Sequence, residues 1–358
     1  MRVLISGGGT GGHLFPAIAV AQALARSDPE GAILYVGRRG GIEEQIVPRY
    51  GIPSALIHAV KLDMESRWRN WKVPFLLPGV LWEAGRILAR FRPQVVLGTG
   101  GYVSAPLVAL AASRRIPVVL QEQNYLPGRT TRMLSRLARL VATAYEESAE
   151  YLPGRRTVTT GTPVRADFQS PRADFPERPR RVLVLGGSQG ARRLNRAVAE
   201  AVAGLLGRAP IELIHQTGPA ELSDLQRVAA QLPSGVRERY HPFGFADDLP
   251  QRLRRADLVV SRAGASTISE TSALGIPMVL VPGAFAGGHQ RYNATPFARA
   301  GAALVIDDAE FDGARLTREL LGIVEDPSRY KRMVEAMHRL GRPHAADAIV
   351  ELLRQVAA

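Results

Sequence analysis

The chain of 358 residues contains no cysteine, which excludes disulfide bonds and metal sites built on thiolates. A reducing cytoplasm is the simplest setting for such a protein. No run reaches the roughly 18 apolar residues that a helix needs to span a bilayer. The first expected strand begins at Arg2, which leaves no space for a signal peptide. The sequence therefore predicts a cytoplasmic protein without a membrane-spanning helix.

Negative charge is scarce relative to positive charge. The chain has 46 Lys and Arg against 33 Asp and Glu, a net charge of +13. Residues 1–170 carry +9 of this excess and the remainder carries +4. Such an excess favours an anionic partner: nucleic acid, a phosphorylated substrate or the anionic cytoplasmic leaflet of a membrane. Only three of the cationic residues are lysine, so a genome that favours arginine is a second explanation for the excess positive charge. Such a bias does not explain why the excess lies mostly in the first half of the chain.

Short apolar runs bounded by glycine or proline alternate with helix-length segments in both halves of the chain. This alternation predicts parallel sheets covered by helices on both faces. Residues 153–179 hold five prolines and many charges, which is typical of a linker between two domains. The expected strands are 2–6, 32–36, 54–58, 94–97, 117–121, 139–142, 181–185, 211–216, 238–242, 257–260, 277–281 and 303–306. The expected helices include 16–26, 41–49, 79–91, 104–113, 128–137, 192–206, 220–230, 247–254, 266–273, 290–300, 315–324 and a last helical segment, 328–356.

Four glycine-rich loops join an expected strand to an expected helix, and they form two matched pairs. Residues 7–13 in the first half correspond to 186–190 in the second, and residues 98–101 correspond to 261–264. A strand, a glycine loop and a helix start together direct backbone N–H groups and a helix dipole at phosphate. The repeat therefore predicts two such domains that face one ligand site.

The first of these loops has the spacing G-x-G-x-x-G at Gly7, Gly9 and Gly12, which alone is weak evidence for a dinucleotide site. The next strand ends at Arg38 instead of the acidic residue that would bind a ribose, so only NADP would suit it. The loop is also longer than a tight pyrophosphate turn needs. Glycines let a phosphate approach the main chain, and Thr10 adds a side-chain donor.

His13 and Glu122 are the candidates for acid–base chemistry. His13 lies where the first glycine loop becomes a helix, and packing against the sheet is its alternative role. Glu122 closes strand 117–121 within Gln-Glu-Gln-Asn, at the edge where open α/β sheets bind ligands. Glu122 could serve as a general base or orient His13. That it lies in a solvated turn without a catalytic role is an equally good interpretation.

Residues 261–270 form the densest group of polar side chains in the second half. Glu270 could accept both hydroxyls of a ribose, and an exposed helical carboxylate is its alternative role. Ser188 opens another helix and can donate to phosphate, where the helix dipole favours negative charge by about 0.3–1 kcal/mol. Arg165 could clamp a diphosphate, or it is a surface arginine.

His289 and Gln290 precede a further helix and could contact sugar hydroxyls. Metal-ligand spacings such as His-x-x-x-His and Asp-x-Asp are missing, and the pairs 247–248 and 307–308 resemble a helix start and a surface turn. Neither a nucleophile elbow nor a Walker lysine is present. The sequence therefore predicts no metal and no other cofactor.

All three tryptophans fall within residues 68–82 and are interleaved with other apolar residues and cations. Tryptophan beside apolar residues and arginine is typical of a segment that lies in a membrane interface. The alternative is a core helix with a basic solvent face. The clustering and the charge asymmetry favour a membrane patch made of Trp68, Trp71, Phe75, Leu76 and Trp82.

Taken together, these motifs resemble those of the MurG family of bacterial N-acetylglucosaminyltransferases along nearly the whole chain. The motifs are GGGTGGHLFPA (7–17), GTGGYVSAP (98–106), QEQN (121–124), GTPVR (161–165), GGSQGAR (186–192), SRAGASTISE (261–270) and HQRYNA (289–294). The family has His at the position of Gln121 and usually Asn at that of Thr162.

The resemblance implies a GT-B fold of class α/β: two Rossmann-like, doubly wound parallel-sheet domains facing a cleft. They would span 1–162 and 163–340, with a final helix in 341–358 packing back on the first. It implies inverting transfer of GlcNAc from UDP-GlcNAc to the C4 hydroxyl of the polyprenyl-linked lipid I, giving lipid II for peptidoglycan, with His13 or Glu122 as the catalytic residues. It further implies a peripheral enzyme on the anionic cytoplasmic leaflet of the cell membrane, with cell-wall synthesis proteins as partners and no nucleic acid.

The resemblance assigns residues to each substrate. Donor-binding residues are Thr10, Gly11, Gly12, Asn124, Arg165, Ser188, Gln189, Gly190, Phe245, Arg262, Ala265, Ser266, Thr267, Glu270, His289 and Gln290. Residues that bind the acceptor diphosphate are Gly8, Gly9, Thr10, Gly100, Gly101 and Tyr102.

Three other functions are compatible with part of the sequence. An NADP-dependent oxidoreductase would explain one glycine loop and would bind 2′,5′-ADP tightly. A nucleotide-sugar 2-epimerase shares the two-domain plan and would turn over UDP-GlcNAc without an acceptor. A basic membrane or nucleic-acid binder would explain the charge and would show salt-sensitive DNA binding without affinity for UDP.

Overall fold

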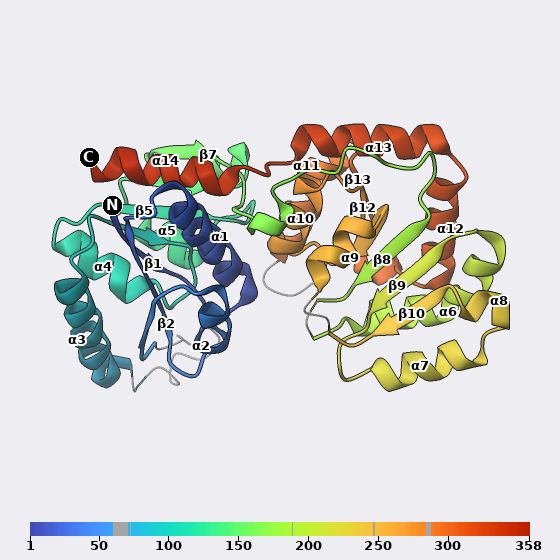
Figure 1. Ribbon diagram of the computed structural model, residues 1–358, viewed down its shortest axis with the longest axis horizontal. Helices are drawn as coiled ribbons and strands as arrows, with labels where there is room; N and C mark the ends of the chain where they lie inside the picture. Colours follow the sequence, from blue (N-terminus) through green and yellow to red (C-terminus); the bar gives the residue numbers. More distant parts are fainter. Residues whose placement is uncertain (60–70, 72, 188, 246–247, 284–287) are drawn as a thin grey trace. The chain divides into compact units, whose positions relative to one another are not determined.

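A computed structural model describes residues 1–59, 71, 73–187, 189–245, 248–283 and 288–358 (Figure 1). The chain forms two compact units: unit 1 comprises Met1–Ala166 and Arg342–Ala358, and unit 2 comprises Asp167–Gly341. The first boundary therefore falls after Ala166 and not after residue 162. Arg165 belongs to unit 1, where its guanidinium lies 4.6 Å from the centre of the Phe15 ring.

Unit 1 is built on a seven-stranded sheet in the order β3-β2-β1-β4-β5-β6-β7, and neighbouring strands pair in parallel. Most of the strand residues are aliphatic and buried, as expected for a sheet covered on both faces. The strands are β1 (Arg2–Ser6), β2 (Ala32–Arg38), β3 (Ser54–Ile57), β4 (Val95–Gly98), β5 (Val118–Glu122), β6 (Leu140–Thr143) and β7 (Thr157–Thr159).

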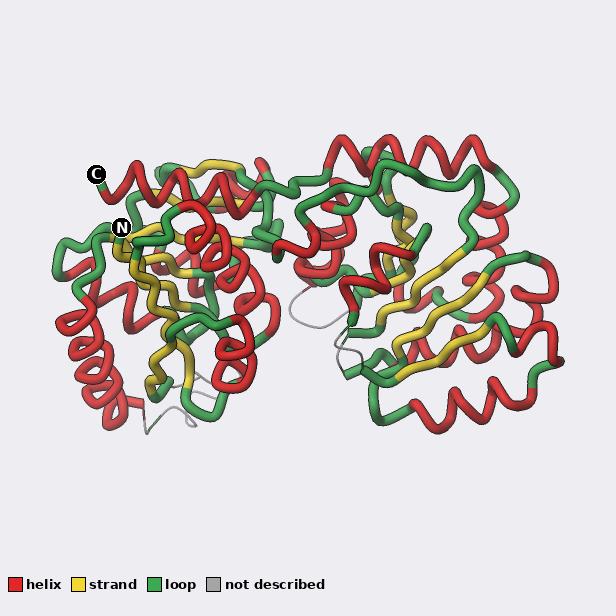
Figure 2. The backbone as a smooth tube through the Cα atoms, viewed as in Figure 1, coloured by secondary structure: helices red, strands yellow, loops and turns green. Residues whose placement is uncertain are grey.

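Two layers of helices cover this sheet (Figure 2). On one face, α1 packs with α14 and the sheet in one apolar core, and α3, α4 and α5 form a second core on the other face. The helices of unit 1 are α1 (Gly11–Ser27), α2 (Ile42–Ile46), α3 (Val73–Phe91), α4 (Ala105–Ser113), α5 (Arg129–Leu134) and α14 (Ala345–Ala357). Short 3-10 helices are η1 (Val47–Tyr50), η3 (Glu146–Tyr151) and η4 (Ala166–Phe168).

Unit 2 repeats the plan with a six-stranded sheet in the order β10-β9-β8-β11-β12-β13, again with parallel neighbours. Its strands are β8 (Arg181–Leu185), β9 (Glu212–Gln216), β10 (Tyr240–Phe243), β11 (Leu258–Ser261), β12 (Met278–Leu280) and β13 (Ala303–Val305). Its helices are α6 (Arg192–Arg208), α7 (Leu222–Gln231), α8 (Ser234–Arg237), α9 (Leu249–Arg255), α10 (Ala265–Ala273), α11 (His289–Arg299), α12 (Gly313–Val324) and α13 (Pro327–Leu340), with the 3-10 helix η6 (Asp308–Glu310).

The expected last helical segment, 328–356, forms two helices, and the second of them matches the final helix expected in 341–358. Helix α13 ends at Leu340, and α14 begins at Ala345. Gly341 and Pro343 lie between them, and proline cannot continue a helix because it lacks an N–H group. The break takes the chain from unit 2 back to unit 1, where α14 lies beside α1 (Figure 1).

Helix α1 starts at Gly11, five residues before the expected start at position 16. Pro16 lies inside the helix and is buried. The turn before it is helical because Leu14 packs in the core of unit 1. This earlier start places His13 in the first helical turn.

The order of the strands locates the ligand-binding edge of each sheet. In unit 1 the chain order reverses between β1 and β4, and in unit 2 it reverses between β8 and β11. Open α/β sheets bind ligands at such switch points, outside the carboxyl ends of the strands. The four glycine loops follow these four strands, so each switch point carries one loop from each matched pair.

Candidate active site

The loop after β1 is fixed by side chains from three other elements. Tyr35 on β2 donates its hydroxyl to the Gly7 carbonyl, and Glu43 on α2 accepts the Gly9 N–H. Gly9 has φ +85°, and a Cβ there would lie 2.9 Å from the Tyr102 ring. The Tyr102 hydroxyl accepts a hydrogen bond of 2.5 Å from Arg38. The loop is therefore rigid and has a cation beside it.

The imidazole of His13 is held at the switch point of unit 1. Its Nδ1 lies 3.0 Å from the Thr99 carbonyl oxygen and 2.6 Å from the side-chain amide of Gln123. A carbonyl only accepts, so the Thr99 contact assigns the hydrogen to Nδ1. The Gln123 amide nitrogen faces Nδ1 in the structure, so this assignment requires the amide to be flipped, with its oxygen accepting from Nδ1. Among the described residues none is hydrogen-bonded to Nε2. His13 therefore presents an unprotonated nitrogen at the loop.

Burial lowers the pKa of His13 below its usual value, and the nearby carboxylates of Glu122 and Glu43 act in the opposite direction. The imidazole is therefore neutral at neutral pH and able to accept a proton. The glycines of the β4 loop admit the ring: a Cβ on Gly100 would lie 2.8 Å from Nδ1, and one on Gly101 would lie 3.1 Å from Cδ2. Close approach of His13 thus accounts for Gly100, whereas at Gly101 the Gly8 carbonyl oxygen lies still closer to such a Cβ than the ring does.

Glu122 is buried at the end of β5, and its carboxylate is fully engaged by the loop that follows. One oxygen accepts the backbone N–H of Asn124 at 3.0 Å and its side-chain amide at 3.1 Å. The other oxygen accepts the Gly128 N–H at 2.9 Å. These bonds shape the loop that carries Asn124 and leave Glu122 as a fixed negative charge near His13.

In unit 2 the glycine loop after β8 packs backbone to backbone against the loop after β9. Gly190 and Gly218 have φ +79° and +80°, and a Cβ on Gly218 would lie 2.6 Å from the Gly190 nitrogen. Only glycine fits at these positions. Gln189 lies in this loop, and Ser188 lies outside the described residues. The packing brings the loop to the start of α6.

A buried polar network supports this loop, and the sequence motifs did not reveal it. Asn195 on α6 donates to the Thr217 carbonyl at 2.8 Å, and its oxygen lies 3.0 Å from His215 Nε2. The other ring nitrogen of His215 lies 3.0 Å from the Tyr240 hydroxyl. Burial lowers the pKa of His215 to about 3, so the ring is neutral and donates from Nε2.

The β11 loop carries the remaining predicted donor residues of unit 2. Helix α10 begins at Ala265 without a side-chain cap, and it presents Ser266 and Thr267 in its first turn and Glu270, which is buried, in its second. The Ser266 hydroxyl is buried and meets no partner among the described residues. Several other helices also lack a side-chain cap, so the missing cap alone does not mark a binding site. The N-terminus of α10 is a candidate for ligand binding because it lies at the switch point.

Four further predicted residues lie around this edge, and two of them, Arg262 and Gln290, have hydrogen bonds to protein groups there. Arg262 donates to the Val281 carbonyl at 3.1 Å and pairs with Asp308. The Gln290 side chain accepts the Gly283 N–H at 2.8 Å, which ties α11 to the β12 loop, and His289 opens that helix. Phe245 is exposed after β10.

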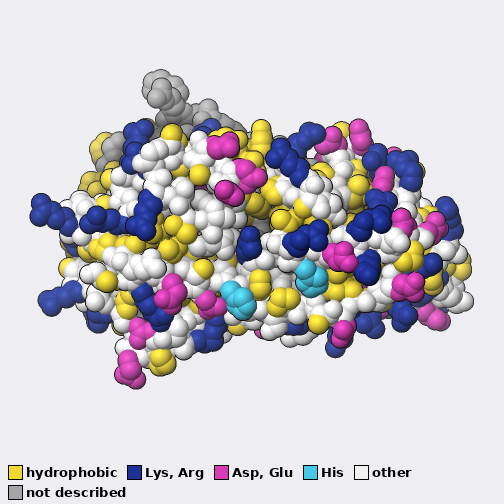
Figure 3. Space-filling view, turned by 90° about the horizontal axis from the view of Figure 1, so that it is seen from above, with side chains coloured by type: hydrophobic (Ala, Val, Ile, Leu, Met, Phe, Trp, Pro, Cys, Tyr) yellow, Lys and Arg dark blue, Asp and Glu magenta, His cyan; other side chains and the backbone are white. Residues whose placement is uncertain are grey.

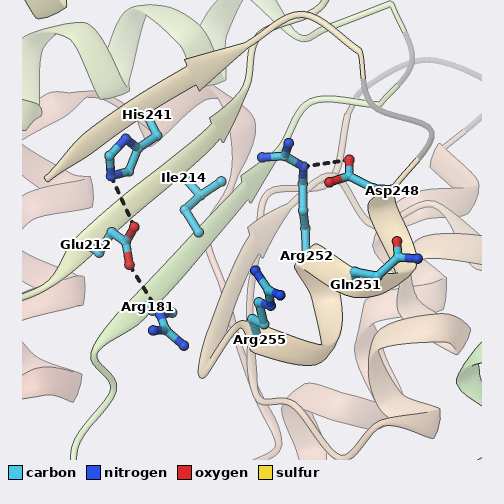
Figure 4. A pocket seen from close by; sticks show the side chains of 8 residues that line it. All are labelled: Arg181, Glu212, Ile214, His241, Asp248, Gln251, Arg252 and Arg255. Carbon is cyan, nitrogen blue, oxygen red and sulfur yellow. Dashed lines mark hydrogen bonds and ion pairs between the residues drawn. The ribbon is translucent and has the colours of Figure 1, made fainter.

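One pocket of unit 2, with a volume of about 480 Å³, lies away from these loops (Figure 4). Arg181 and Glu212 at the beginnings of β8 and β9 line it, together with α9, and Glu212 holds both Arg181 (3.2 Å) and His241 (3.0 Å). None of the predicted site residues lines it. We therefore locate the site by the strand ends.

Most of the predicted membrane patch is on the surface of unit 1. Trp71, Phe75 and Trp82 are 63%, 78% and 65% exposed, and Leu76 is half exposed. Trp68 lies outside the described residues. Arg86 stacks over the Trp82 ring at 5.6 Å. On the face shown in Figure 3, Lys and Arg side chains are scattered among acidic ones over both units.

The two doubly wound units and their glycine loops define the GT-B fold. Residues 3–143 match the glycosyltransferase family 28 N-terminal domain, and residues 181–349 match the C-terminal domain of that family. The chain belongs to glycosyltransferase family 28 and, within it, to the MurG N-acetylglucosaminyltransferases.

Relatives of full length support this membership. The chain is 39% identical to the UDP-N-acetylglucosamine–N-acetylmuramyl-(pentapeptide) pyrophosphoryl-undecaprenol N-acetylglucosamine transferase of Desulforudis audaxviator, covering 100% of this chain and 99% of the relative. It is 41% identical to the protein of the same name from Moorella thermoacetica, covering 99% and 98%.

Solved structures give the same result for the fold. Acinetobacter baumannii MurG matches with a TM-score of 0.79 and 28% identity over 99% of both chains. A putative UDP-N-acetylglucosamine 2-epimerase from Listeria monocytogenes matches with a TM-score of 0.73, covering 99% of this chain and 96% of that one. At 16% identity, the second likeness shows the fold alone.

Proposed function

We propose that the chain transfers N-acetylglucosamine from UDP-GlcNAc to a polyprenyl-diphospho-N-acetylmuramoyl-pentapeptide, the lipid I of peptidoglycan synthesis. The observation that carries this proposal is the position of the neutral His13 imidazole at the switch point of a family 28 N-terminal unit. Its Nδ1 is hydrogen-bonded, and its Nε2 has no hydrogen-bond partner among the described residues. Both substrates named for the relatives contain a diphosphate, and the chain has one glycine-loop switch point in each unit.

The donor would bind at the switch point of unit 2. The N-termini of α6 and α10 favour the negative charge of a diphosphate. Glu270 would accept the ribose hydroxyls, and the residues around Ser188, Phe245 and Gln290 would contact the rest of UDP-GlcNAc. The contribution of Arg165 to this site stays a prediction, since its guanidinium donates at 3.1 Å to the Tyr50 hydroxyl.

The acceptor diphosphate would bind at the switch point of unit 1. Arg38, held on the Tyr102 hydroxyl, adds positive charge beside the loop, and the start of α1 adds N–H groups at Gly11 and Gly12. The muramoyl C4 hydroxyl would then lie within reach of His13.

The chemical step would be a single displacement with inversion. The hydroxyl oxygen forms the new bond to C1 of GlcNAc, the bond from C1 to the UDP oxygen breaks, and His13 Nε2 takes the hydroxyl proton. The transition state has oxocarbenium character, and negative charge grows on the departing diphosphate. Uncapped helix N-termini would stabilise that charge. Glu122 would stabilise the imidazolium that forms.

Transfer itself is the first test. The protein is incubated with radiolabelled UDP-GlcNAc and a short-chain polyprenyl muramoyl-pentapeptide acceptor, with and without EDTA. Label is expected in the lipid product with one UDP released per sugar, and EDTA is expected to leave the rate unchanged. Turnover of UDP-GlcNAc without acceptor would instead identify an epimerase. No described group of three or more His, Asp or Glu side chains is arranged to hold a metal ion.

We further propose that unit 1 docks on an anionic membrane through the patch of Trp71, Phe75, Leu76 and Trp82 on and beside α3. No helix in the described part of the chain is long and apolar enough to cross a bilayer. Exposed aromatic rings beside arginines are suited to the interface, where each cation contributes about 1 kcal/mol near an anionic surface.

Vesicle binding tests the patch. The double variant Phe75→Ser with Trp82→Ser is expected to lower the affinity for vesicles of mixed anionic lipid by about 10²-fold, since each ring contributes roughly 1.5–3 kcal/mol on full burial. Tyr292→Ser, an exposed aromatic of unit 2, is the matched control and is expected to bind like the wild type. Equal sedimentation of all three proteins would rule out the patch.

A further inference from the structure

A buried carboxylate lies beneath the glycine loop that carries His13. Glu43, on the short helix α2, is only 1% exposed, whereas its neighbour Glu44 faces solvent. Three glycines make room for it. A Cβ on Gly8 would lie 2.6 Å from the Glu43 carboxyl carbon, one on Gly37 would lie 2.8 Å from its Cβ, and one on Gly41 would lie 3.1 Å from its carboxyl carbon.

This niche draws on three separate segments: the β1 loop, the end of β2 and the turn before α2. Glycines from all three segments border the same side chain, so the niche is a built feature of unit 1. The niche also explains why residue 8 is glycine without invoking contact with a phosphate.

The carboxylate holds the loop through one bond. One oxygen of Glu43 accepts the Gly9 N–H. That N–H is therefore not among the donors that the loop offers to a diphosphate. Tyr35 holds the neighbouring Gly7 carbonyl, so the loop is fixed through an N–H and a carbonyl two residues apart. Four residues beyond Gly9 the chain reaches His13.

The second oxygen of Glu43 is buried and meets no donor among the described residues. An amide would accept the Gly9 N–H equally well without burying a charge, which is costly in a protein interior. The hydrogen bond to Gly9 therefore does not explain why a charged side chain is buried at this position.

His13 is the ionisable group on which this charge acts. Burial lowers the pKa of His13, and the negative charges of Glu122 and Glu43 oppose that lowering. The charged groups around the ring are Glu122 at the end of β5 and Glu43 on α2, while the β4 loop supplies the Thr99 carbonyl and Tyr102, which holds Arg38.

We propose that Glu43 is a positioning residue of this site: through Gly9 it holds the loop that carries His13, and its negative charge acts on the imidazole. This inference rests on the proposed transfer reaction for its kinetic consequence. Its structural part concerns unit 1 alone.

Two variants separate the bond from the charge. Glu43→Gln keeps an acceptor for the Gly9 N–H and removes the charge, whereas Glu43→Ala removes both. Glu44→Gln, the exposed neighbour on the same helix, is the matched control. We expect Glu43→Ala to lower kcat by about tenfold or more, because the loop that carries His13 loses its hydrogen bond through Gly9. Glu43→Gln should restore most of the kcat.

The pH dependence is the readout that a merely structural role would not move. Removing a negative charge near His13 removes a contribution that raises its pKa, so the acid limb of kcat should move to lower pH in Glu43→Gln. The control should keep the wild-type profile. The same shift should appear in an NMR titration of the His13 Cε1–H signal, assigned by comparison with His13→Gln.

The NMR titration keeps this inference apart from the transfer reaction, because it needs no activity. Absence of transfer by wild-type protein would contradict the proposed function, while the His13 titration would still report on Glu43. An unshifted His13 titration in Glu43→Gln would overturn the inference, whether or not Glu43→Ala folds. A folded Glu43→Ala with a wild-type kcat would overturn it as well.

Discussion

Replacing His13 with alanine is expected to lower kcat for GlcNAc transfer by about 10²–10⁴-fold, the range that a positioned general base contributes. The reason is the position of Nε2, which meets no described partner, on a ring fixed through Nδ1 by Thr99 and Gln123. Binding of UDP-GlcNAc, measured by calorimetry, is expected to stay within about twofold of wild type, since His13 is not among the residues assigned to the donor.

His58→Ala is the matched control for this variant. His58 is an exposed histidine of the same unit and pairs with Glu83 at 2.8 Å. It is expected to leave kcat unchanged. Circular dichroism and a thermal melt check that both variants are folded.

The wild-type pH profile should carry the signature of the same group. A base works in its unprotonated form, so kcat should rise with pH through the pKa of His13 and level off above it. Burial depresses this pKa, so the midpoint should fall below the usual value of about 6.5. The acid limb should vanish in His13→Ala.

The alternative base is Glu122, and the two variants distinguish the assignments. The Glu122 carboxylate already accepts bonds from Asn124 and Gly128, so Glu122→Ala should disturb the loop that carries Asn124 and weaken transfer less than His13→Ala does. A His13→Ala protein with near wild-type turnover beside an inactive Glu122→Ala protein would reverse the roles.

Most strands of both sheets are predictable because they are short, largely aliphatic runs that are buried. Among the described strands, β7 alone is missing from the expected set. Thr157–Thr159 is only three residues long and lies within the proline-rich stretch that was interpreted as a linker. The start of α1 was misplaced because Pro16 was interpreted as a helix start, whereas packing of Leu14 extends the helix back to Gly11.

The location of the candidate site was also predictable, because glycine loops after buried strands are local features. The contacts that shape it were not. Gln123 lies 110 residues from His13 in sequence, and Glu43 lies 34 residues from Gly9. No spacing rule connects such pairs, since only the strand order of the sheet brings them together. The sequence suggested that Gly100 approaches a phosphate, whereas the structure places the His13 ring against it.

The largest effect on stability is expected from replacing Asp257, which directly precedes β11 in unit 2. Its carboxylate accepts the Arg180 and Arg181 N–H groups, both at 2.9 Å, and pairs with Arg172 at 2.8 Å. Asp257 is buried and its side chain is 5% exposed. The carboxylate therefore fastens the segment that enters unit 2 to the first strand of its sheet.

Asp257→Ala leaves two backbone donors and a partly buried guanidinium without their acceptor. Breaking a buried pair on one side costs about 3–5 kcal/mol. For a unit of this size, 1 kcal/mol corresponds to a Tm change of roughly 2–4 °C, so the transition of unit 2 should fall by about 6 °C or more. Calorimetry of the full chain measures it.

Asp224→Ala provides the comparison, because it removes an aspartate of the same unit that pairs with Arg227 on the surface. Exposed pairs contribute about 0–1 kcal/mol, so its Tm should remain within roughly 2 °C of wild type. Each variant removes one carboxylate and one arginine pair, so the difference between them reports the burial of Asp257 together with its two backbone hydrogen bonds. Equal Tm values for the two variants would mean that water replaces Asp257 as the partner of Arg172 and of the two backbone donors. Asp257 would then not fasten the segment that leads into β8.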